Sequence, residues 1–376
     1  MNISISREQL LPALISTSSV VEKRQTLPIL SNLLMKQSNG QLSITGSNLE
    51  VEVNKTINGL GTDEVEVTLA ANKLVEICRA LPAGSMLNIK IDQGKAILTS
   101  GKSRFTLKSL PSNEFPELQA MDYQERFTLP VTALKSILEM TSFSMAAQDV
   151  RYYLNGILLE VESNRVVAVA TDGHRLSKSE ALLDDSQTPD KHQIIIPRKA
   201  IQEIMRLLTA LSETGGEGES VRLELNSKHL KLSAGDTVIT STLINGQFPE
   251  YESILAADLD KSIQIERQHF VEALTRIAVL TNDRLHGVRL NFRDNVLKIS
   301  TNNPEQEEAE DEIECVYEGE EITTSFNVNY IIEALKVINS ENVLINIKDN
   351  DSVCLLDKPG YTLSAWLVMT MRLYLN

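Results

Sequence analysis

Several features common in secreted, membrane-bound and disulfide-rich proteins are missing from this sequence of 376 residues. The start, Met1 to Arg7, lacks the basic and then apolar segments of a signal peptide. No apolar run approaches the roughly 20 residues that a membrane-spanning helix needs. Cys78, Cys315 and Cys354 are far apart and form no CxxC pair, which favours buried thiols over a disulfide framework or a zinc site. We expect a cytoplasmic protein with no membrane partner, no metal and no other cofactor.

A phosphate-binding loop is also missing. Gly101-Lys102-Ser103 resembles the end of such a loop, but Ala96 stands where the motif needs a glycine. Residues 104–107 alternate like a strand where a helix should begin, so the backbone amides that hold a phosphate would be absent. This segment does not predict nucleotide binding.

The best candidate for catalysis is Thr171-Asp172-Gly173-His174-Arg175, because Asp172 and His174 could orient a base. No nucleophile motif or second metal-ligand cluster accompanies it. The same residues favour a tight turn between two strands, at residues 166–170 and 176–178. We therefore expect no enzyme, and a hydrolase that uses Asp172 and His174 is the alternative.

What the sequence does contain is an internal repeat. Residues 3–5 alternate like a strand, and residues 7–11 begin a helical pattern. The same strand and helix return at 127–129 with 133–138, and at 263–265 with 270–274. The strand starts are 124 and 136 residues apart, which predicts three domains of similar size.

Each third contains the pattern a second time. Strands at 67–69, 194–196 and 324–326 precede helices at 74–77, 201–204 and 331–334. Alternating strands follow, as at 223–225 and 230–233. We predict an α+β chain with domains at 1–122, 123–255 and 256–376, each built of two strand-helix-strands units with short helices on one side. Chance recurrence of short helix-and-strand units is the alternative.

The net charge of −15 at first argues against a nucleic-acid partner. The charge is uneven, however. The predicted helices, counted over 7–16, 72–80, 132–141, 198–209, 267–277 and 329–338, carry +4 together, so the rest of the chain carries −19. A neutral to positive helical face suits a phosphate backbone approached from one side only. Sampling noise in a small count remains the alternative.

Several stretches across the chain together resemble the bacterial β sliding clamps, the β subunits of DNA polymerase III. The matching stretches are residues 26–30, 148–156, 170–176, 196–199, 287–290, 302–310 and 369–373. The resemblance implies a DNA-clamp fold and a head-to-tail homodimeric ring, with helices lining the channel and sheets outside. It also implies a processivity factor that slides on duplex DNA without sequence preference. Its further partners would be the replicative polymerase, the clamp loader, translesion polymerases and repair proteins.

The resemblance also implies three sets of site residues. The DNA-binding set comprises Arg24 and Gln148, with Lys73, Arg79, Arg198, Lys199 and Arg206 as further helix candidates. At the dimer seam, Phe105 and Leu107 would pack against Val279 and Leu280 of the partner subunit, and Lys102 and Arg104 would face Glu305, Glu307 and Glu308. The partner-peptide set comprises Arg151, Tyr153, Leu154, Thr171, Gly173, His174, Arg175, Leu176, Pro249, Ile254, Asn327, Tyr330, Leu367, Met369, Met371 and Arg372.

Alternatives and departures accompany these sets. The DNA-binding cations could be ordinary surface charges. The segment 305–321 holds ten acidic residues and no lysine or arginine, so it could be a solvated face, although a cationic edge from another subunit would relieve its repulsion. Ser253 and Cys354 replace residues that the family often has in the peptide pocket, Thr370 stands where proline is usual, and residues 374–376 extend past the usual end. A clamp-like scaffold that never loads on DNA is the second alternative function.

Overall fold

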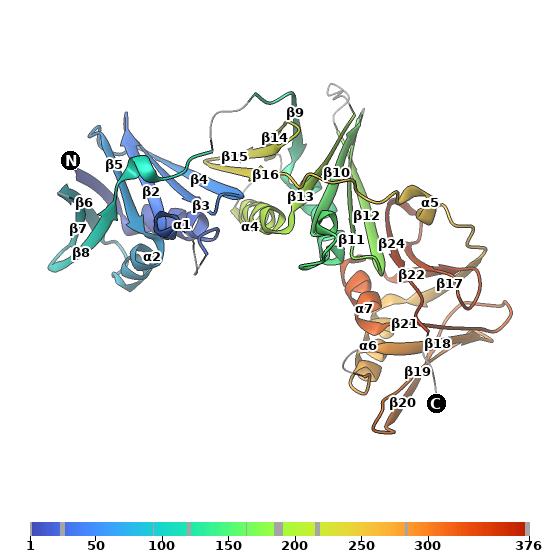
Figure 1. The fold of residues 1–376 in the computed structure, drawn as a ribbon. Coiled ribbons are helices and arrows are strands. Elements are labelled where there is room, and N and C mark those ends of the chain that lie inside the picture. The colour runs from blue at the N-terminus through green and yellow to red at the C-terminus, as the bar shows by residue number, and fades with distance from the viewer. Residues whose placement is uncertain are drawn as a thin grey trace. The chain divides into compact units, whose positions relative to one another are not determined.

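The computed structural model describes residues 2–22, 27–92, 94–118, 122–162, 164–183, 191–214, 219–282 and 285–372. Within these ranges the chain forms six successive units of one strand, one helix and three strands (Figure 1). Each predicted strand and helix coincides with one of these elements, although the predicted helices 132–141 and 329–338 run one or two residues past the ends of α3 and α7. The repeat prediction is therefore confirmed. In the described residues, no helix is both long and apolar enough to cross a membrane.

The elements follow one another in the same order in each third. The first third contains β1 (Asn2–Ser6), α1 (Arg7–Ser18), β2 (Asn32–Ser38), β3 (Gln41–Ser47), β4 (Val51–Asn58), β5 (Val65–Ala70), α2 (Ala71–Ala80), β6 (Met86–Asp92), β7 (Lys95–Ser100) and β8 (Ser103–Leu110). The middle third contains β9 (Glu125–Pro130), α3 (Val131–Glu139), β10 (Gly156–Glu162), β11 (Arg165–Thr171), β12 (Arg175–Leu182), β13 (His192–Pro197), α4 (Arg198–Thr214), β14 (Ser220–Leu225), β15 (His229–Ala234) and β16 (Thr237–Thr242). The last third contains β17 (Lys261–Glu266), α6 (Arg267–Ala278), β18 (Gly287–Arg293), β19 (Val296–Asn302), β20 (Glu308–Glu314), β21 (Ile322–Asn327), α7 (Val328–Val337), β22 (Asn342–Ile347), β23 (Cys354–Lys358) and β24 (Tyr361–Val368). Short helical turns connect them at η1 (Pro28–Ser31), η2 (Ser112–Glu114), η3 (Ser142–Ser144), η4 (Tyr152–Leu154) and α5 (Glu252–Leu255).

The two units of each third interlock through their first strands. Strand β1 pairs with β6 of the second unit, and β5 pairs with β2 of the first. The same exchange joins β9 to β14 and β13 to β10, and then β17 to β22 and β21 to β18. Neither unit can complete its sheet alone, so two units make one domain.

The chain divides into two compact bodies, and each is described by itself. The first body, residues 1–132 and 199–243, contains a 12-stranded sheet in the order β1-β6-β7-β8-β5-β2-β3-β4-β16-β15-β14-β9. The second body, residues 133–198 and 244–376, contains an eight-stranded sheet, β13-β10-β11-β12-β24-β23-β22-β17, and a four-stranded sheet, β20-β19-β18-β21. The two long sheets therefore continue from one third of the chain into the next, at β4–β16 and at β12–β24.

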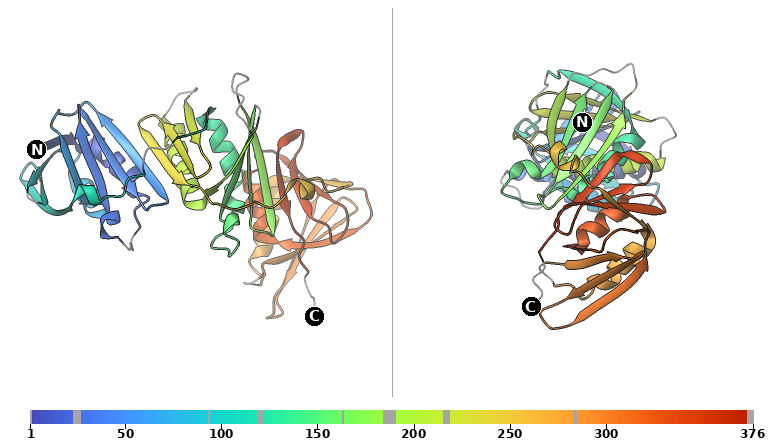
Figure 2. Two further views of the ribbon diagram at one scale, coloured as in Figure 1. Left: turned by 45° about the horizontal axis from the view of Figure 1, so that its top comes forward. Right: turned by 90° about the vertical axis from the view of Figure 1, so that its right-hand side faces the viewer.

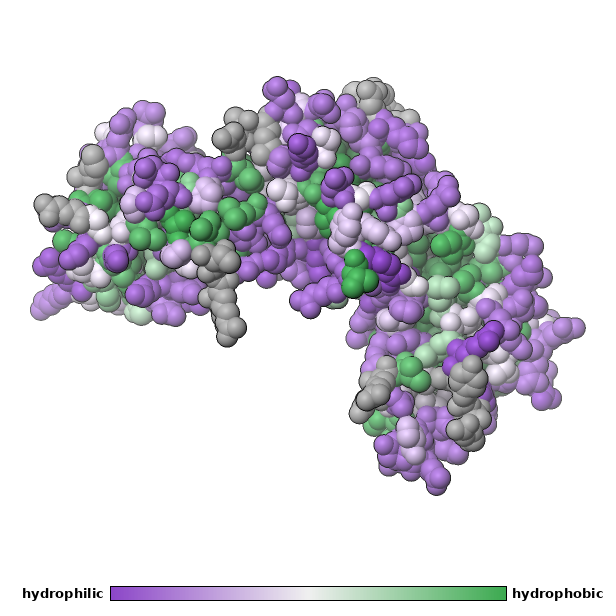
Figure 3. Space-filling model, in the orientation of Figure 1, coloured by the Kyte–Doolittle hydropathy of each residue, from purple (hydrophilic) through white to green (hydrophobic). Residues whose placement is uncertain are grey.

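Alternation sets which face of each sheet is buried. In β1, Ile3 and Ile5 are fully buried whereas Asn2 and Ser4 are exposed, as the period of two requires. Helix α1 adds Leu10, Ala13 and Leu14 to the same core at helical spacing, and α2 adds Leu74 and Val75. The strands of this third, in blue, lie side by side in the left view of Figure 2. Polar residues dominate the visible surface, with hydrophobic ones in small groups (Figure 3).

Side-chain caps start three of the helices. Gln9 N donates to Ser6 Oγ at the start of α1, and Gln268 N and His269 N donate to Glu266 at the start of α6. Asn327 caps α7 by accepting from Asn329 N. These caps satisfy backbone donors that have no partner within the helix, which fixes where each helix begins.

Candidate functional site

Thr171 to Arg175 form a tight turn between β11 and β12, as predicted. Asp172 Oδ1 accepts from His174 N at 2.9 Å and from Arg175 N at 3.1 Å. Thr171 Oγ1 accepts from Gly173 N at 3.1 Å and donates to Arg175 O at 2.6 Å. The Asp172 carboxylate thus closes the turn through two backbone amides and pairs with the Arg175 guanidinium, so both of its oxygens are engaged away from the His174 ring.

The Arg175 side chain, predicted to contact a partner peptide, is largely used inside the chain. Only 10% of it is exposed, and its guanidinium pairs with Glu333 on α7 and with Asp172 at 3.1 Å. It also donates to Phe143 O at 2.6 Å and lies 4.5 Å from the Tyr330 ring centroid. Arg175 therefore joins the turn, η3 and α7, and its main effect is to position the neighbours His174 and Tyr330.

His174 and Tyr330, from the same predicted peptide set, do come together. Their rings stack with centroids 6.4 Å apart and an interplanar angle of 21°. Asn327, one turn before Tyr330, uses its side chain to cap α7 and to donate to Leu285 O at 3.3 Å. Two aromatic rings therefore lie together beside the turn. The Asn327 side chain is already engaged in hydrogen bonds within the chain.

Arg151 is fixed beside the turn by a partner that the sequence did not reveal. Its Nε and Nη2 form a fork on the two oxygens of Asp149, at 3.0 and 2.8 Å, and Nη2 also donates to Asp172 O at 3.1 Å. The hydrogen bonds from Arg151 lower the pKa of Asp149 to about 2. Gly173 has φ +87°, which glycine adopts without strain, and a Cβ there would lie 2.8 Å from Arg151 Nη1, so the Arg151 side chain would have to shift.

An apolar cluster of the second body includes Leu176, which directly follows this turn. Leu176 and Leu367 face each other in the β12–β24 ladder and are only 4% and 3% exposed. The buried cluster also includes Leu158, Val167, Val169, Ile195 and Tyr251, with Tyr153, Ile244, Phe248, Leu255, Val353 and Leu355 packed against it. Leu154, also from the predicted set, is 2% exposed. The sequence signal that could have found Tyr251 and Phe248 is the apolar content of the segment after β16.

The exposed edge of this cluster carries the remaining predicted residues. Ile254 is 41% exposed and Met369 is 46% exposed, and Pro249 is also exposed. We use the name partner groove for this apolar cluster together with Arg151, His174, Tyr330, Ile254 and Met369, which stand for the peptide site that the resemblance implies. The cluster is apolar and the exposed residues beside it are mixed, a composition that suits a peptide-binding site.

The chain end is tied down beside the groove as far as Met371. Met369 N donates to His174 O at 2.9 Å, and Met371 N donates to Ser325 O at 2.8 Å. Between them, Thr370 Oγ1 donates to Asp351 O at 3.0 Å, a bond that proline could not make. Arg372 is exposed, and residues 374–376 lie outside the described residues. Ser253 is exposed on α5, whereas Cys354 is 1% exposed in the core and offers no surface to a ligand.

Gln148 and Arg198, predicted to bind DNA, border a second hollow next to the turn. This pocket, of about 690 Å³, is also lined by His174, Arg175 and Tyr330. Gln148 has φ +58°, an uncommon conformation for a residue other than glycine that is often found at functional positions. Arg198 donates to Met145 O at 3.0 Å and Ala146 O at 3.3 Å, so part of its hydrogen-bonding capacity is used.

The other predicted DNA-binding cations differ in whether they pair with carboxylates of the same chain. Lys73 and Arg79 are exposed on α2. On α4, Lys199 pairs with Glu22, and Arg206 pairs with Glu203. Arg24 lies outside the described residues. Cations already paired with carboxylates contribute less to a phosphate site than a count of charges predicts.

The residues predicted for a subunit seam lie along β8 in the first body, and at the end of α6 and around the start of β20 in the second. Lys102 and Arg104 are exposed at the start of β8, with Phe105 half-buried and Leu107 only 8% exposed in the core of the first body. In the second body, Val279 at the end of α6 is 78% exposed, and Leu280 is half-buried.

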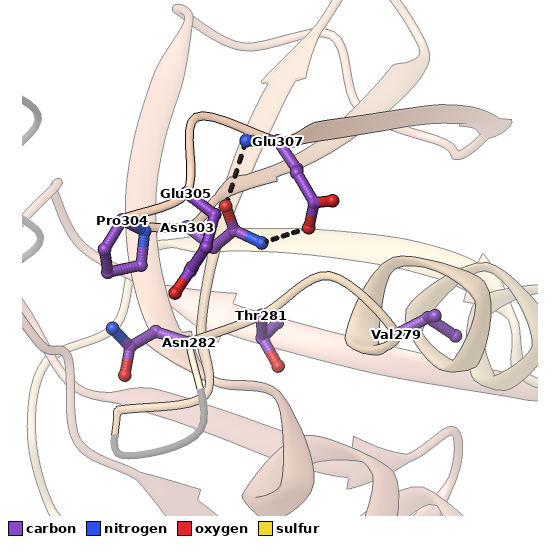
Figure 4. A pocket seen from close by; sticks show the side chains of 7 residues that line it. All are labelled: Val279, Thr281, Asn282, Asn303, Pro304, Glu305 and Glu307. Atoms are coloured by element: carbon purple, nitrogen blue, oxygen red, sulfur yellow. Dashed lines mark hydrogen bonds between the residues drawn. The ribbon is translucent and has the colours of Figure 1, made fainter.

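Val279 lines a pocket of about 550 Å³ together with Thr281, Asn282, Asn303, Pro304, Glu305 and Glu307 (Figure 4). Asn303 holds the Glu307 backbone at 2.9 Å and its carboxylate at 2.7 Å, which shapes this corner. Val279, Glu305 and Glu307, all predicted on the same side of the seam, thus line one pocket. Glu308 is exposed at the start of β20.

Comparison with known proteins gives one consistent result. Models of the DNA polymerase III beta subunit match residues 1–119 by its N-terminal domain, 128–250 by its central domain and 252–372 by its C-terminal domain. The beta sliding clamp of Pseudomonas aeruginosa is 42% identical over 376 residues, covering 99% of this chain and 100% of that protein. That of Escherichia coli K12 is 38% identical over 374 residues, with the same coverage. A crystal structure of a Pseudomonas aeruginosa sliding clamp bound to griselimycin matches with a TM-score of 0.93 and 40% identity, covering 99% of this chain and 100% of that one.

Proposed function

The chain belongs to the family of DNA polymerase III β subunits, the bacterial sliding clamps, which are non-enzymatic processivity factors, and we propose that it works as a head-to-tail homodimeric ring around duplex DNA. The family resemblance and the three-domain clamp fold are confirmed. The domain limits 1–122, 123–255 and 256–376, the site residues and a cytoplasmic location remain part of the proposal.

The observation that carries the ring is a strand pairing that the chain leaves incomplete. The last strand of the first unit in one third pairs with the last strand of the second unit in the next: β4 with β16, and β12 with β24. By the same rule β20 requires a partner equivalent to β8. In the described residues β20 pairs only with β19, and β8 meets β5 only at Ser109 and Leu110, so residues 103–108 keep one edge open.

Another copy of the chain can complete this pairing. If β8 of one protomer joins β20 of the next, two copies leave no such edge and the assembly closes into a ring instead of growing as a fibre. The arrangement is head-to-tail because each contact joins two different edges, and it is a ring because two such contacts close on themselves.

Charge and shape on the two edges are complementary. Lys102, Arg104 and Lys108 are exposed along the first edge, and Glu305, Glu307 and Glu308 along the second. Phe105 could enter the hollow beside Val279. Such ion pairs at a rim fix register and steer assembly more than they add stability, so the apolar contact would supply most of the free energy.

In such a ring the DNA would be held by topology. The residues proposed to contact the phosphates are the predicted DNA-binding set: Arg24, Gln148, Lys73, Arg79, Arg198, Lys199 and Arg206. Because a closed ring cannot fall off, weak contacts without sequence preference suffice, and weak contacts permit sliding.

We also propose that the partner groove takes short peptide segments with hydrophobic anchors. The flexible Met369 and Met371 side chains beside the apolar floor can adapt to different anchors, and Arg151, His174 and Tyr330 can orient the peptide. The replicative polymerase, the clamp loader, translesion polymerases and repair proteins would be tethered here one at a time.

The decisive experiment asks whether the protein is held by topology. Clamp loaded onto nicked circular DNA by a loader should remain bound through gel filtration, and should leave when a restriction enzyme linearises that DNA. Retention on linear DNA with free ends would contradict the ring. Failure to load at all, with an intact partner groove, would favour the clamp-like scaffold.

A further inference from the structure

One lysine of the proposed DNA face is already held by a carboxylate of its own chain. Lys199, the second residue of α4, forms an ion pair with Glu22, which follows α1 by four residues. Asn48 Nδ2 also lies 3.5 Å from the same Glu22 oxygen. The hydrogen bond from Lys199 lowers the pKa of Glu22, so the carboxylate is ionised at neutral pH.

We propose that Glu22 competes with DNA phosphate for Lys199 and so weakens the hold of the clamp on the duplex. This inference rests on the proposed function. A phosphate that binds Lys199 must displace Glu22, and the displaced carboxylate then stays near the phosphate as a like charge. Both effects lower the free energy gained when a phosphate binds Lys199.

The exposure of the pair is what allows the exchange. The side chains of Lys199 and Glu22 are 51% and 42% exposed, so a phosphate can reach the ammonium and Glu22 can turn into water. The pair between Arg206 and Glu203 on the same helix differs. The Glu203 side chain is only 10% exposed and also accepts from Ser19 at the end of α1, so it holds the two helices together and is not free to exchange. The structure therefore singles out Glu22 as the exchangeable carboxylate.

The expected size follows from general values. An exposed ion pair changes an equilibrium constant by at most about fivefold, and each phosphate contact adds about 0.9 to the slope of log affinity against log salt. Glu22→Gln should therefore tighten binding to a short primed duplex by roughly two- to fivefold at 50 mM salt and steepen the slope toward about 0.9 more per protomer.

The test is a double-mutant cycle measured by fluorescence anisotropy over a salt series. The proteins are the wild type, Glu22→Gln, Lys199→Gln and the double variant. Lys199→Gln alone should cost less than about twofold, because its charge is already engaged. In the Glu22→Gln background, Lys199→Gln should remove the whole gain in DNA affinity that Glu22→Gln produces. This non-additivity is a readout that a purely structural role of the pair would not produce.

Glu66→Gln serves as the matched control. Glu66 lies on β5 and pairs with Lys36 at 3.5 Å, with similar side-chain exposure (46% and 39%), and neither residue is in the proposed DNA set. This variant removes the same charge and should leave DNA affinity and slope unchanged. Melting temperatures of all variants show whether the fold is intact.

Each remaining outcome decides the question. Unchanged affinity in Glu22→Gln overturns the inference, and so does an equal gain with and without Lys199, since Glu22 would then act by general repulsion. If the wild type itself shows no salt-dependent affinity for the duplex and does not load onto circular DNA, the proposed function fails as well.

Discussion

The change Val279→Asp should separate the proposed dimer into folded monomers. Val279 is 78% exposed in the single chain, so the substitution leaves the core of its own domain intact. Burying a valine at the seam is worth about 1.5 kcal/mol or more, and an unpaired carboxylate there costs at least about 2 kcal/mol further. Glu305 and Glu307 line the same hollow and add repulsion. The loss is about 3–4 kcal/mol for each seam.

A ring of two protomers contains the seam twice, so the dimer loses about 6–8 kcal/mol, or at least 10⁴-fold in its dissociation constant at about 1.4 kcal/mol per factor of ten. Sedimentation velocity at micromolar concentration should show a monomer with an unchanged circular dichroism spectrum. The matched control is Val316→Asp, because Val316 is 64% exposed in the same body but lies outside the proposed seam. A dimer that survives Val279→Asp as well as it survives Val316→Asp would refute the seam.

Three further changes test the groove and the fold. Gly173→Ala should weaken binding of an anchor-bearing peptide several-fold in anisotropy titrations, because φ is +87° there and the new Cβ would push Arg151 off its position; an unchanged affinity would show that Arg151 does not orient the peptide. Deletion of residues 374–376 should leave peptide affinity within a few fold, whereas deletion of 370–376 should abolish it and spare the dimer, since Met371 and Thr370 are the last tied residues; undiminished binding after the longer deletion would contradict the groove assignment. Burial raises the pKa of Glu52, so its ionised form costs stability above the ordinary glutamate range and not below it; Glu52→Gln should raise the melting temperature at pH 8, and the gain should vanish as the pH falls below about 4. A gain independent of pH would exclude this cause.

The elements and their order could be predicted because their signals are local. Alternation marks strands such as β21, where Thr324 and Phe326 are buried and Thr323 and Ser325 less so. Helical spacing of Leu10, Ala13 and Leu14 marks α1, and its cap at Ser6 precedes it directly in the chain. A repeat read from such signals needs no knowledge of which strands pair.

The strand exchange between units could not be predicted, because nothing local distinguishes β6 from β2 as the partner of β1. The same limit explains the contact of Arg151 with Asp172 O and the position of Arg175 between Glu333 and Tyr330. These contacts depend on segments brought together by the fold. Cys354 illustrates the converse: the resemblance drew attention to it as a residue of the peptide pocket, whereas the alternation along β23 places its side chain in the core.

The helices show why a count of charges made on the sequence overstates how strongly a surface attracts phosphate. Of the helix cations that gave +4, most are bound within the chain. Arg198 and Arg267 donate to backbone carbonyls, and Lys199, Arg206 and Arg276 pair with Glu22, Glu203 and Asp311. Lys73 and Arg79 on α2 remain exposed. These helices therefore attract phosphate less strongly than helices with unpaired cations would. For a protein retained by closure this is an advantage, because every strong phosphate contact must be broken for each step along the duplex, and topology already prevents escape.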